Sequence, residues 1–340
     1  EMKLIRTEDA VGHVLCHDMT QIIKDQYKDA RFRKGHVVTE EDIPVLLSMG
    51  KEHLYVWEMT PGMVHENDAA ERLLALCGQE NMIRSGVKEG KIELKAACDG
   101  VFLVDSARLV AVNSQDEVMI ATRKGGTAVR EGDKLAGMRV IPLIIEEEKL
   151  RKAEQAAGDK PLLSLKPYVR KTACIVATGG EVKKGLIKDT FTPVVIDKLK
   201  TYGIETLEVV YSGDGVENVR DAVLAMREKK PDMILCTGGM SVDPDDNTPG
   251  GIKAAGANII AYGAPVLPGA MFLLGYFDDG MPVMGLPGCV MYAGATVFDL
   301  VLPKIAADVP VTRADLAALG EGGLCLGCKP CHYPICPFGK

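Results

Sequence analysis

From Lys171 onward the chain alternates short apolar runs with helical segments, and each of three runs leads into glycines. Apolar strands that alternate with helices predict a mostly parallel sheet with helices on both faces. Ligands of such sheets bind beyond the carboxyl ends of the strands, so the glycine loops predict a binding site at one edge. The runs and their loops are Thr172–Thr178 with Gly179-Gly180-Glu181, Asp232–Cys236 with Gly238-Gly239, and Pro282–Met284 with Gly285-Leu286-Pro287-Gly288.

This alternation divides the chain into parts. We expect a mixed, largely β region over 1–145, a charged helical linker over 146–170, a doubly wound three-layer α/β domain over 171–307 and a small cysteine-rich tail over 320–340. Helices are predicted at Thr39–Met49 and Asn67–Cys77, and strands at 92–97, 100–105, 108–113 and 118–122. A long apolar helix is expected over Val290–Ile305, directly after Gly288.

The loop after Asp232–Cys236 carries the clearest chemistry. Three carboxylates, Asp243, Asp245 and Asp246, follow Gly238 and Gly239. Glycines let backbone N–H groups approach an oxyanion, and carboxylates hold Mg²⁺ together with substrate phosphates. We expect a phosphorylated ligand bound with a metal. Asp246 is the first candidate for the metal or catalytic role, and Thr248 is expected to cap the next helix with Pro249 in its first turn.

Composition excludes several classes of protein. The 340 residues carry a formal net charge of −7, whereas a nucleic-acid-binding protein normally presents a basic face. No apolar run reaches membrane-spanning length, and the first residues have no signal-peptide layout. We therefore expect a cytoplasmic protein that contacts neither nucleic acid nor membrane.

Four of the ten cysteines crowd into the last sixteen residues. This density indicates a metal site more often than disulfides. Four thiolates suit tetrahedral zinc, His332 adds a three-cysteine, one-histidine set, and the spacing that ends in Cys-Pro is also similar to ferredoxin-type iron–sulfur ligation. Zinc is the first expectation and an iron–sulfur cluster the second. The four residues are Cys325, Cys328, Cys331 and Cys336.

Residues 172–306 resemble the molybdopterin-binding domain of molybdenum cofactor biosynthesis proteins. That family's signatures are a T-G-x-E loop, an S/T-G-G loop followed by acidic residues, and G-L-P-G. The chain has them in order as Thr178-Gly179-Gly180-Glu181, Thr237-Gly238-Gly239 and Gly285-Leu286-Pro287-Gly288. The first 145 residues are more diffusely similar to the preceding domains of the molybdenumtransferase branch, through 10–15 and 33–38. That branch implies a homodimer.

The resemblance implies molybdopterin or adenylylated molybdopterin as ligand, Mg²⁺ at Asp246, and molybdate transfer with release of AMP. The implied catalytic residues are Asp246, Asp243 and Asp245. The implied ligand-binding residues are Thr178, Gly179, Gly180, Glu181, Thr237, Gly238, Gly239, Ser241, Thr248, Pro249, Gly285, Pro287 and Gly288.

The chain departs from the transferase branch where that branch reads K-P-G-K-P. Leu267 and Ala270 replace both lysines, while Asp246-x-Thr248-Pro249 resembles the D-x-T-P of the adenylyltransferase branch. Lys183, Lys184 and Lys188 either meet the anion or stay exposed, and Asp214 is read as a turn residue. The alternative to a transferase is a non-catalytic molybdopterin carrier, chaperone or sensor whose metal tail docks on a molybdoenzyme.

Overall fold

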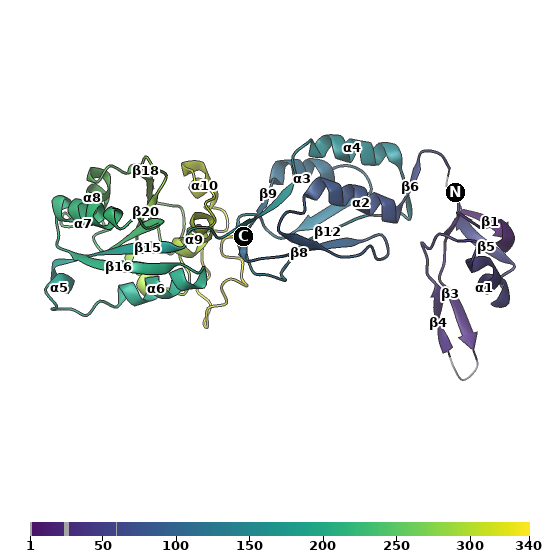
Figure 1. Ribbon diagram of the computed structural model, residues 1–340, viewed down its shortest axis with the longest axis horizontal. Coiled ribbons are helices and arrows are strands. Elements are labelled where there is room, and N and C mark those ends of the chain that lie inside the picture. The colour runs from purple at the N-terminus through teal and green to yellow at the C-terminus, as the bar shows by residue number, and fades with distance from the viewer. Residues whose placement is uncertain (1, 24–26, 59) are drawn as a thin grey trace. The chain divides into compact units, whose positions relative to one another are not determined.

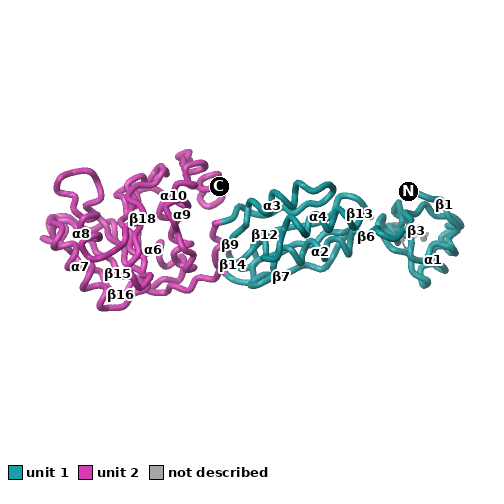
Figure 2. The backbone as a smooth tube through the Cα atoms, turned by 90° about the horizontal axis from the view of Figure 1, so that it is seen from above, with its two compact units in different colours: residues 1–98, 102–125, 130–165 teal, residues 99–101, 126–129, 166–340 magenta. Residues whose placement is uncertain are grey.

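The computed structural model describes residues 2–23, 27–58 and 60–340. Two compact units divide the chain (Figure 2). Unit 1 comprises 1–98, 102–125 and 130–165, and unit 2 comprises 99–101, 126–129 and 166–340. Each is described separately below. No helix of the described residues is long and apolar enough to cross a membrane.

The first part of unit 1 is a small β structure with one α-helix (Figure 1). Its three-stranded sheet has the order β1-β5-β2, and β3 pairs with β4 in an antiparallel hairpin. A core that includes Leu15, Leu46 and Leu54 holds it together. The elements are β1 (Met2–Arg6), η1 (Thr7–Asp9), β2 (Val14–Leu15), β3 (Met19–Ile23), β4 (Tyr27–Phe32), α1 (Asp42–Ser48) and β5 (His53–Trp57).

The second part of unit 1 combines helices with a four-stranded sheet of order β10-β12-β8-β7. The region up to residue 145 is largely β, as expected. Its remaining elements are β6 (Met63–His65), α2 (Glu66–Cys77), β7 (Met82–Arg84), β8 (Ile92–Ala96), α3 (Ser106–Asn113), β10 (Val118–Thr122), β12 (Lys134–Val140), β13 (Ile144–Glu146) and α4 (Glu147–Ala157). Strands β9 (Gly100–Val104) and β14 (Leu163–Pro167) include residues of both units, and β11 (Thr127–Val129) belongs to unit 2.

One segment of this region differs from its predicted type. The strand expected over 108–113 is helix α3, because the Asp105 carboxylate accepts a hydrogen bond from the Arg108 amide at 3.1 Å and caps a helix there. Helix α4, expected as part of a linker, lies in unit 1, where Leu150, Ala153 and Ala157 are buried. The charged residues of α4 lie on its opposite side. The high proportion of charged residues suggested a linker, although the helix has an apolar stripe on one face.

Unit 2 is built on a six-stranded sheet of order β16-β15-β17-β20-β19-β18. The first four strands in this order pair in parallel, and β19 joins β20 and β18 in antiparallel fashion. The strands are β15 (Thr172–Thr178), β16 (Glu205–Ser212), β17 (Met233–Thr237), β18 (Asn258–Tyr262), β19 (Leu273–Tyr276) and β20 (Pro282–Leu286).

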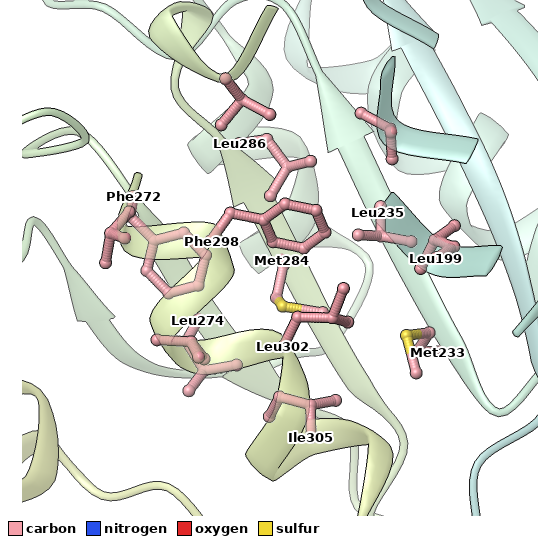
Figure 3. Close-up of a cluster of buried hydrophobic side chains, with 14 of the residues drawn as sticks. Leu199, Met233, Leu235, Phe272, Leu274, Met284, Leu286, Phe298, Leu302 and Ile305 are labelled. Atoms are coloured by element: carbon pink, nitrogen blue, oxygen red, sulfur yellow. The ribbon is translucent and has the colours of Figure 1, made fainter. Parts of the chain in front are cut away.

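Helices cover both faces of this sheet. Ile175 of β15 faces the core that contains α6 and α9, whereas Cys174 and Val176 face the core that contains α7 and α8. Figure 3 shows the first core, in which Phe298 of α9 packs among Met284, Leu286 and Leu235 of the strands. The helices are α5 (Gly180–Lys183), α6 (Phe191–Thr201), α7 (Val216–Glu228), α8 (Thr248–Ala254), α9 (Val297–Ala306) and α10 (Arg313–Ala318).

The long helix expected from Val290 is shorter than predicted. Residues Gly288–Met291 form a single 3-10 turn, η2, and α9 begins at Val297. Thr296 and Asp299 exchange side-chain and backbone hydrogen bonds in a capping box, which sets the start of α9. The sequence predicted one continuous helix because apolar residues occur both in η2, which is partly buried, and in α9.

Candidate ligand site

Three loops of unit 2 surround one cavity of about 480 Å³. They follow β17, follow β20 and precede β19, so the carboxyl ends of neighbouring parallel strands deliver two of them to the same edge. The lining residues are Gly238, Gly239, Met240, Ser241, Asp246, Gly269, Ala270, Met271, Leu286, Pro287, Gly288, Cys289, Met291 and Tyr292.

The glycine pair is required by backbone geometry. Gly238 has φ of 80°, and a Cβ there would lie 2.2 Å from the carbonyl oxygen of Thr178. Gly239 has φ of 61°, and a Cβ there would lie 2.6 Å from Thr248 Oγ1. The loop that follows Thr237, the last residue of β17, therefore packs directly against β15. Its other side lines the cavity.

Thr248 has a different role from the predicted cap. It is the first residue of α8, fully buried, and its hydroxyl donates to the Gly238 carbonyl oxygen at 2.7 Å. Asn247 stands at the N-cap without a side-chain capping bond, and Pro249 lies in the first turn as expected. Thr248 thus closes the glycine loop onto the helix instead of capping the helix.

The three aspartates separate in space. Asp246 lines the cavity, and its Oδ2 accepts a hydrogen bond from the Ser241 amide at 2.8 Å. Asp243 and Asp245 are exposed and absent from the lining; the Asp243 backbone carbonyl accepts from the Asp246 amide at 2.9 Å. Asp243 therefore shapes the turn that presents Asp246.

A tyrosine that the sequence reasoning missed supports this loop. The Tyr262 hydroxyl donates to the Met240 carbonyl oxygen at 2.7 Å. Burial, and then the charge of Asp246, raise the pKa of Tyr262, so it stays a neutral donor. Its position at the end of β18, far along the chain, offered no local signal.

The Gly285–Gly288 loop reaches the cavity through Leu286, Pro287 and Gly288. Gly285 lies within β20, where a Cβ would stand 2.6 Å from the Met240 thioether. Because α9 begins at Val297, this loop leads into the short turn η2 and not into the long α-helix that the sequence predicts.

The T-G-G-E loop, Thr178–Glu181, lies outside the lining of this cavity. The Gly179 amide donates to the Ser212 carbonyl at 3.2 Å, and the Gly180 amide donates to both carboxylate oxygens of Asp214 at 3.2 and 3.3 Å. Both glycine amides therefore bond to protein, and Asp214 anchors the loop. None of Thr178, Gly179, Gly180 and Glu181 lines the 480 Å³ cavity, and Glu181, Lys183, Lys184 and Lys188 are exposed.

Charge is sparse in this cavity. Of the described residues that line it, Asp246 is the sole charged one, and none is lysine or arginine. Gly269, Ala270 and Met271 contribute from the segment where the resembling transferases carry lysines. Most of the other lining side chains are apolar, among them Met240, Leu286 and Met291.

The cysteine-rich segment lies beyond α10. Cys325 and Cys336 are partly buried against the core of unit 2, and Cys328 and Cys331 are exposed. All four are free thiols. Within the described ranges, no three His, Cys, Asp or Glu residues gather closely enough to hold a single metal ion.

Two family profiles match the chain. Residues 174–307 match a probable molybdopterin binding domain, and residues 4–58 match a domain of unknown function, DUF8806. CinA-like proteins of Mycobacterium tuberculosis (strain H37Rv) and Petrotoga mobilis are 33% and 32% identical over 76 residues, which is 22% of this chain. The matched segment covers 18% and 19% of those relatives' length.

Solved structures of molybdenum cofactor proteins resemble this chain weakly. MogA is 20% identical over 41% of this chain and 97% of its own, with a TM-score of 0.36. The molybdopterin biosynthesis enzyme MoaB of Thermus thermophilus is 16% identical over 42% and 98%, with a TM-score of 0.35. A molybdenum cofactor biosynthesis protein of Pyrococcus furiosus covers 94% of this chain and 65% of its own at 13% identity and a TM-score of 0.27. These scores support no inference about the site.

Proposed function

We propose that the 480 Å³ cavity binds molybdopterin or its adenylylated form together with Mg²⁺, because residues 174–307 match a probable molybdopterin binding domain. The observation that carries this proposal is the convergence of three loops on one cavity that has a single carboxylate, Asp246. Its volume lies within the range of about 300–1,000 Å³ that small-molecule sites occupy.

The residues present fit a magnesium ion shared with the ligand. Mg²⁺ is usually held by one or two carboxylates, with substrate phosphates and water completing its shell. Asp246 supplies one carboxylate, held in place by the Ser241 amide, whereas a cage of three carboxylates is not formed among the described residues. A bound magnesium ion would supply the positive charge that the cavity walls lack.

The remaining walls suit a flat heterocycle. Met240, Met271 and Leu286 offer polarizable and apolar contacts, and the exposed backbone of Gly239 and Gly288 allows close approach of polar ligand atoms. This chain's own residues would therefore bind and orient the ligand, while Asp246 positions the cation beside its phosphate.

For the reaction, we propose molybdate insertion into adenylylated molybdopterin with release of AMP, catalysed by positioning and charge neutralisation at Asp246. A second candidate is a carrier that binds the ligand without turnover. The lysine-free and arginine-free lining favours the carrier, because an oxyanion such as molybdate would meet no protein cation there. Homodimer formation stays a prediction from the resemblance, and docking on a molybdoenzyme stays a prediction of the carrier alternative.

The test titrates the purified full chain with molybdopterin and adenylylated molybdopterin, with Mg²⁺ and molybdate present, and follows ligand binding and AMP release together. We expect Asp246→Asn to abolish the Mg²⁺ dependence of binding and any AMP release. The control is Asp278→Asn, an exposed aspartate outside the lining. Binding without AMP release would assign the carrier role, and equal binding by wild type and Asp246→Asn would refute the site.

A further inference from the structure

We propose that the C-terminal segment holds an iron–sulfur cluster of the four-iron class, bound by Cys325, Cys328, Cys331 and Cys336. All four cysteines line a single cavity of about 370 Å³ in unit 2. His332 lines the same cavity. The inference goes beyond the proposed function, because the cluster would form whether or not the neighbouring pocket binds a pterin.

The start of this segment is anchored to the loop before β19. The Leu267 amide donates to the Gly323 carbonyl at 2.9 Å, and the Cys325 amide donates to the Leu267 carbonyl at 2.8 Å. Leu267 and Leu324 form a parallel β-bridge. The first cysteine is therefore held in place by backbone hydrogen bonds.

The end of the segment is anchored in the core. Phe338 is 3% exposed, and its ring packs edge-on against Tyr333, with the ring centroids 6.1 Å apart. The Tyr333 hydroxyl donates to the Asp299 carbonyl at 3.2 Å, and the Gly339 amide donates to the Gly322 carbonyl at 2.9 Å. The four thiols thus sit on a loop whose two ends are fixed, as a preorganised site requires.

The size of the shared space distinguishes a cluster from one zinc ion. Zinc–sulfur bonds of about 2.3 Å in a tetrahedron bring four thiolates to within about 4 Å of one another. The described residues contain no such gathering, yet all four cysteines border one cavity. A group larger than one ion, with several irons each bound to one thiolate, suits that arrangement. The Cys-x2-Cys-x2-Cys run is similar to three ligands of a ferredoxin-type cluster. In that pattern the cysteine before proline ligates a second cluster, whereas here Cys336 lines the same cavity as the other three cysteines. We therefore favour iron–sulfur over the zinc expected from sequence.

Gly294, in one wall of the cavity, lies in close contact with Cys331. A Cβ placed on Gly294 would lie 2.8 Å from Cys331 Sγ and 2.9 Å from its Cβ. Gly294 has no positive φ, so its backbone conformation does not require glycine. A side chain at this position is excluded by the close approach of Cys331. The Cys331 side chain therefore rests directly on the chain segment between η2 and α9.

The cluster cavity adjoins the ligand pocket. Tyr292 lines both cavities, and the loop before β19 contributes Pro268 to the cluster cavity and Gly269 to the ligand pocket. Through its hydrogen bonds to Leu267, the C-terminal segment therefore contacts the loop before β19. This is the loop in which Leu267 and Ala270 replace the lysines of the transferase branch. Each cysteine would bind iron as a thiolate and release its proton to solvent.

The experiment purifies the full chain without oxygen, removes bound metal and reconstitutes it with a mixture of ferrous and ferric iron and with sulfide. We expect about four irons and four sulfides per chain and a sulfide-to-iron charge-transfer band. Cys328→Ser and Cys331→Ser should lose most of both, since these exposed residues tolerate serine without disturbing the core. The control Cys98→Ser, in unit 1, should keep both.

Gly294→Ala provides a second variant that keeps every ligand. It should lower the iron content, because its methyl group overlaps Cys331, whereas Gly86→Ala, with no atom within 4 Å of the added Cβ, should not. One zinc per chain in place of iron and sulfide, no metal at all, or equal loss in Cys98→Ser would overturn the proposal. Iron content is measured without any pterin, so its failure is separable from failure of the proposed function.

Discussion

At the scale of single residues, the site depends on backbone positions that exclude side chains. Gly238 has both a positive φ and a close neighbour, since its Cβ would meet the Thr178 carbonyl. Gly256 also has a positive φ, 97°, but has no atom within 4 Å of an added Cβ. Substituting each glycine by alanine therefore separates the cost of backbone strain, present at both positions, from the cost of steric overlap, present only at Gly238.

We predict that Gly238→Ala destabilises unit 2 by about 2–5 kcal/mol and abolishes ligand binding, because about 1–2 kcal/mol of backbone strain adds to about 1–3 kcal/mol of overpacking. Gly256→Ala should cost the backbone strain alone. Urea unfolding of both variants measures the difference. Equal destabilisation would show that Gly238 is not held against β15.

Asp189 illustrates how one carboxylate gives unit 2 a pH dependence. Burial by itself would raise the pKa of Asp189, but hydrogen bonds from the Thr192 and Phe191 amides and the Tyr211 hydroxyl outweigh it and lower the pKa. A folded pKa below the unfolded value of about 3.9 stabilises the fold above that pH, and the stabilisation is lost as pH falls through the folded pKa.

We therefore predict that Asp189→Asn lowers stability at pH 7 and that the difference from wild type shrinks on acidification below about pH 4. Unfolding midpoints in urea between pH 7 and pH 3 measure it. A constant difference across this range would contradict the assignment, since only the ionised carboxylate gains from the three donors.

At the scale of elements, caps and anchors decide where segments begin. Thr296 is fully buried, and its hydroxyl accepts from the Phe298 amide at 3.2 Å at the start of α9. We predict that Thr296→Ala costs about 1 kcal/mol and that Thr296→Ser, which keeps the hydroxyl, costs less. Thermal unfolding compares the two variants. A larger loss in the serine variant would mean that the methyl group, and not the cap, matters there.

The C-terminal segment is the second element whose anchoring can be measured. Phe338 is 3% exposed in the core of unit 2, whereas Ile335, three residues earlier, is 87% exposed. Phe338→Ala should destabilise unit 2 by about 3–5 kcal/mol, and Ile335→Ala should change stability by less than about 0.5 kcal/mol. Chemical denaturation of metal-free protein tests this. Similar values for both would show that the segment does not pack on the core.

At the scale of the whole molecule, unit 2 is discontinuous in sequence. Residues 99–101 and 126–129 belong to it although they precede its main segment by many positions. The Tyr168 hydroxyl donates to the Gly100 carbonyl at 3.1 Å, and a Cβ on Gly126 would lie 3.1 Å from Lys304 Cε. A cut at residue 166 would remove these partners.

We predict that a fragment of residues 166–340 folds with lower stability than unit 2 in the full chain. Hydrogen exchange of peptides from β15 and β17 reports on unit 2 in both the fragment and the full chain. Faster exchange in the fragment is expected, because Tyr168 and Lys304 lose neighbours. Identical protection would show that 99–101 and 126–129 contribute nothing to unit 2.

The sequence by itself determined the α/β class, the bounds of the α/β domain and the glycine loop that carries Gly238, Gly239 and Asp246. These are local signals: apolar runs, glycines that permit unusual backbone angles, and a carboxylate beside them. They were readable because a strand's end and its following loop are adjacent in the chain.

Only the tertiary structure decided which loops share a cavity. The T-G-G-E loop has as strong a signature as the others, yet its glycine amides bond to Ser212 and Asp214, which are distant in sequence. The start of α9 depended on the buried Thr296 cap, and the common cavity of four cysteines depended on Leu267 and Phe338. Such pairings arise from packing between elements, and neither composition nor periodicity encodes which donors meet which acceptors.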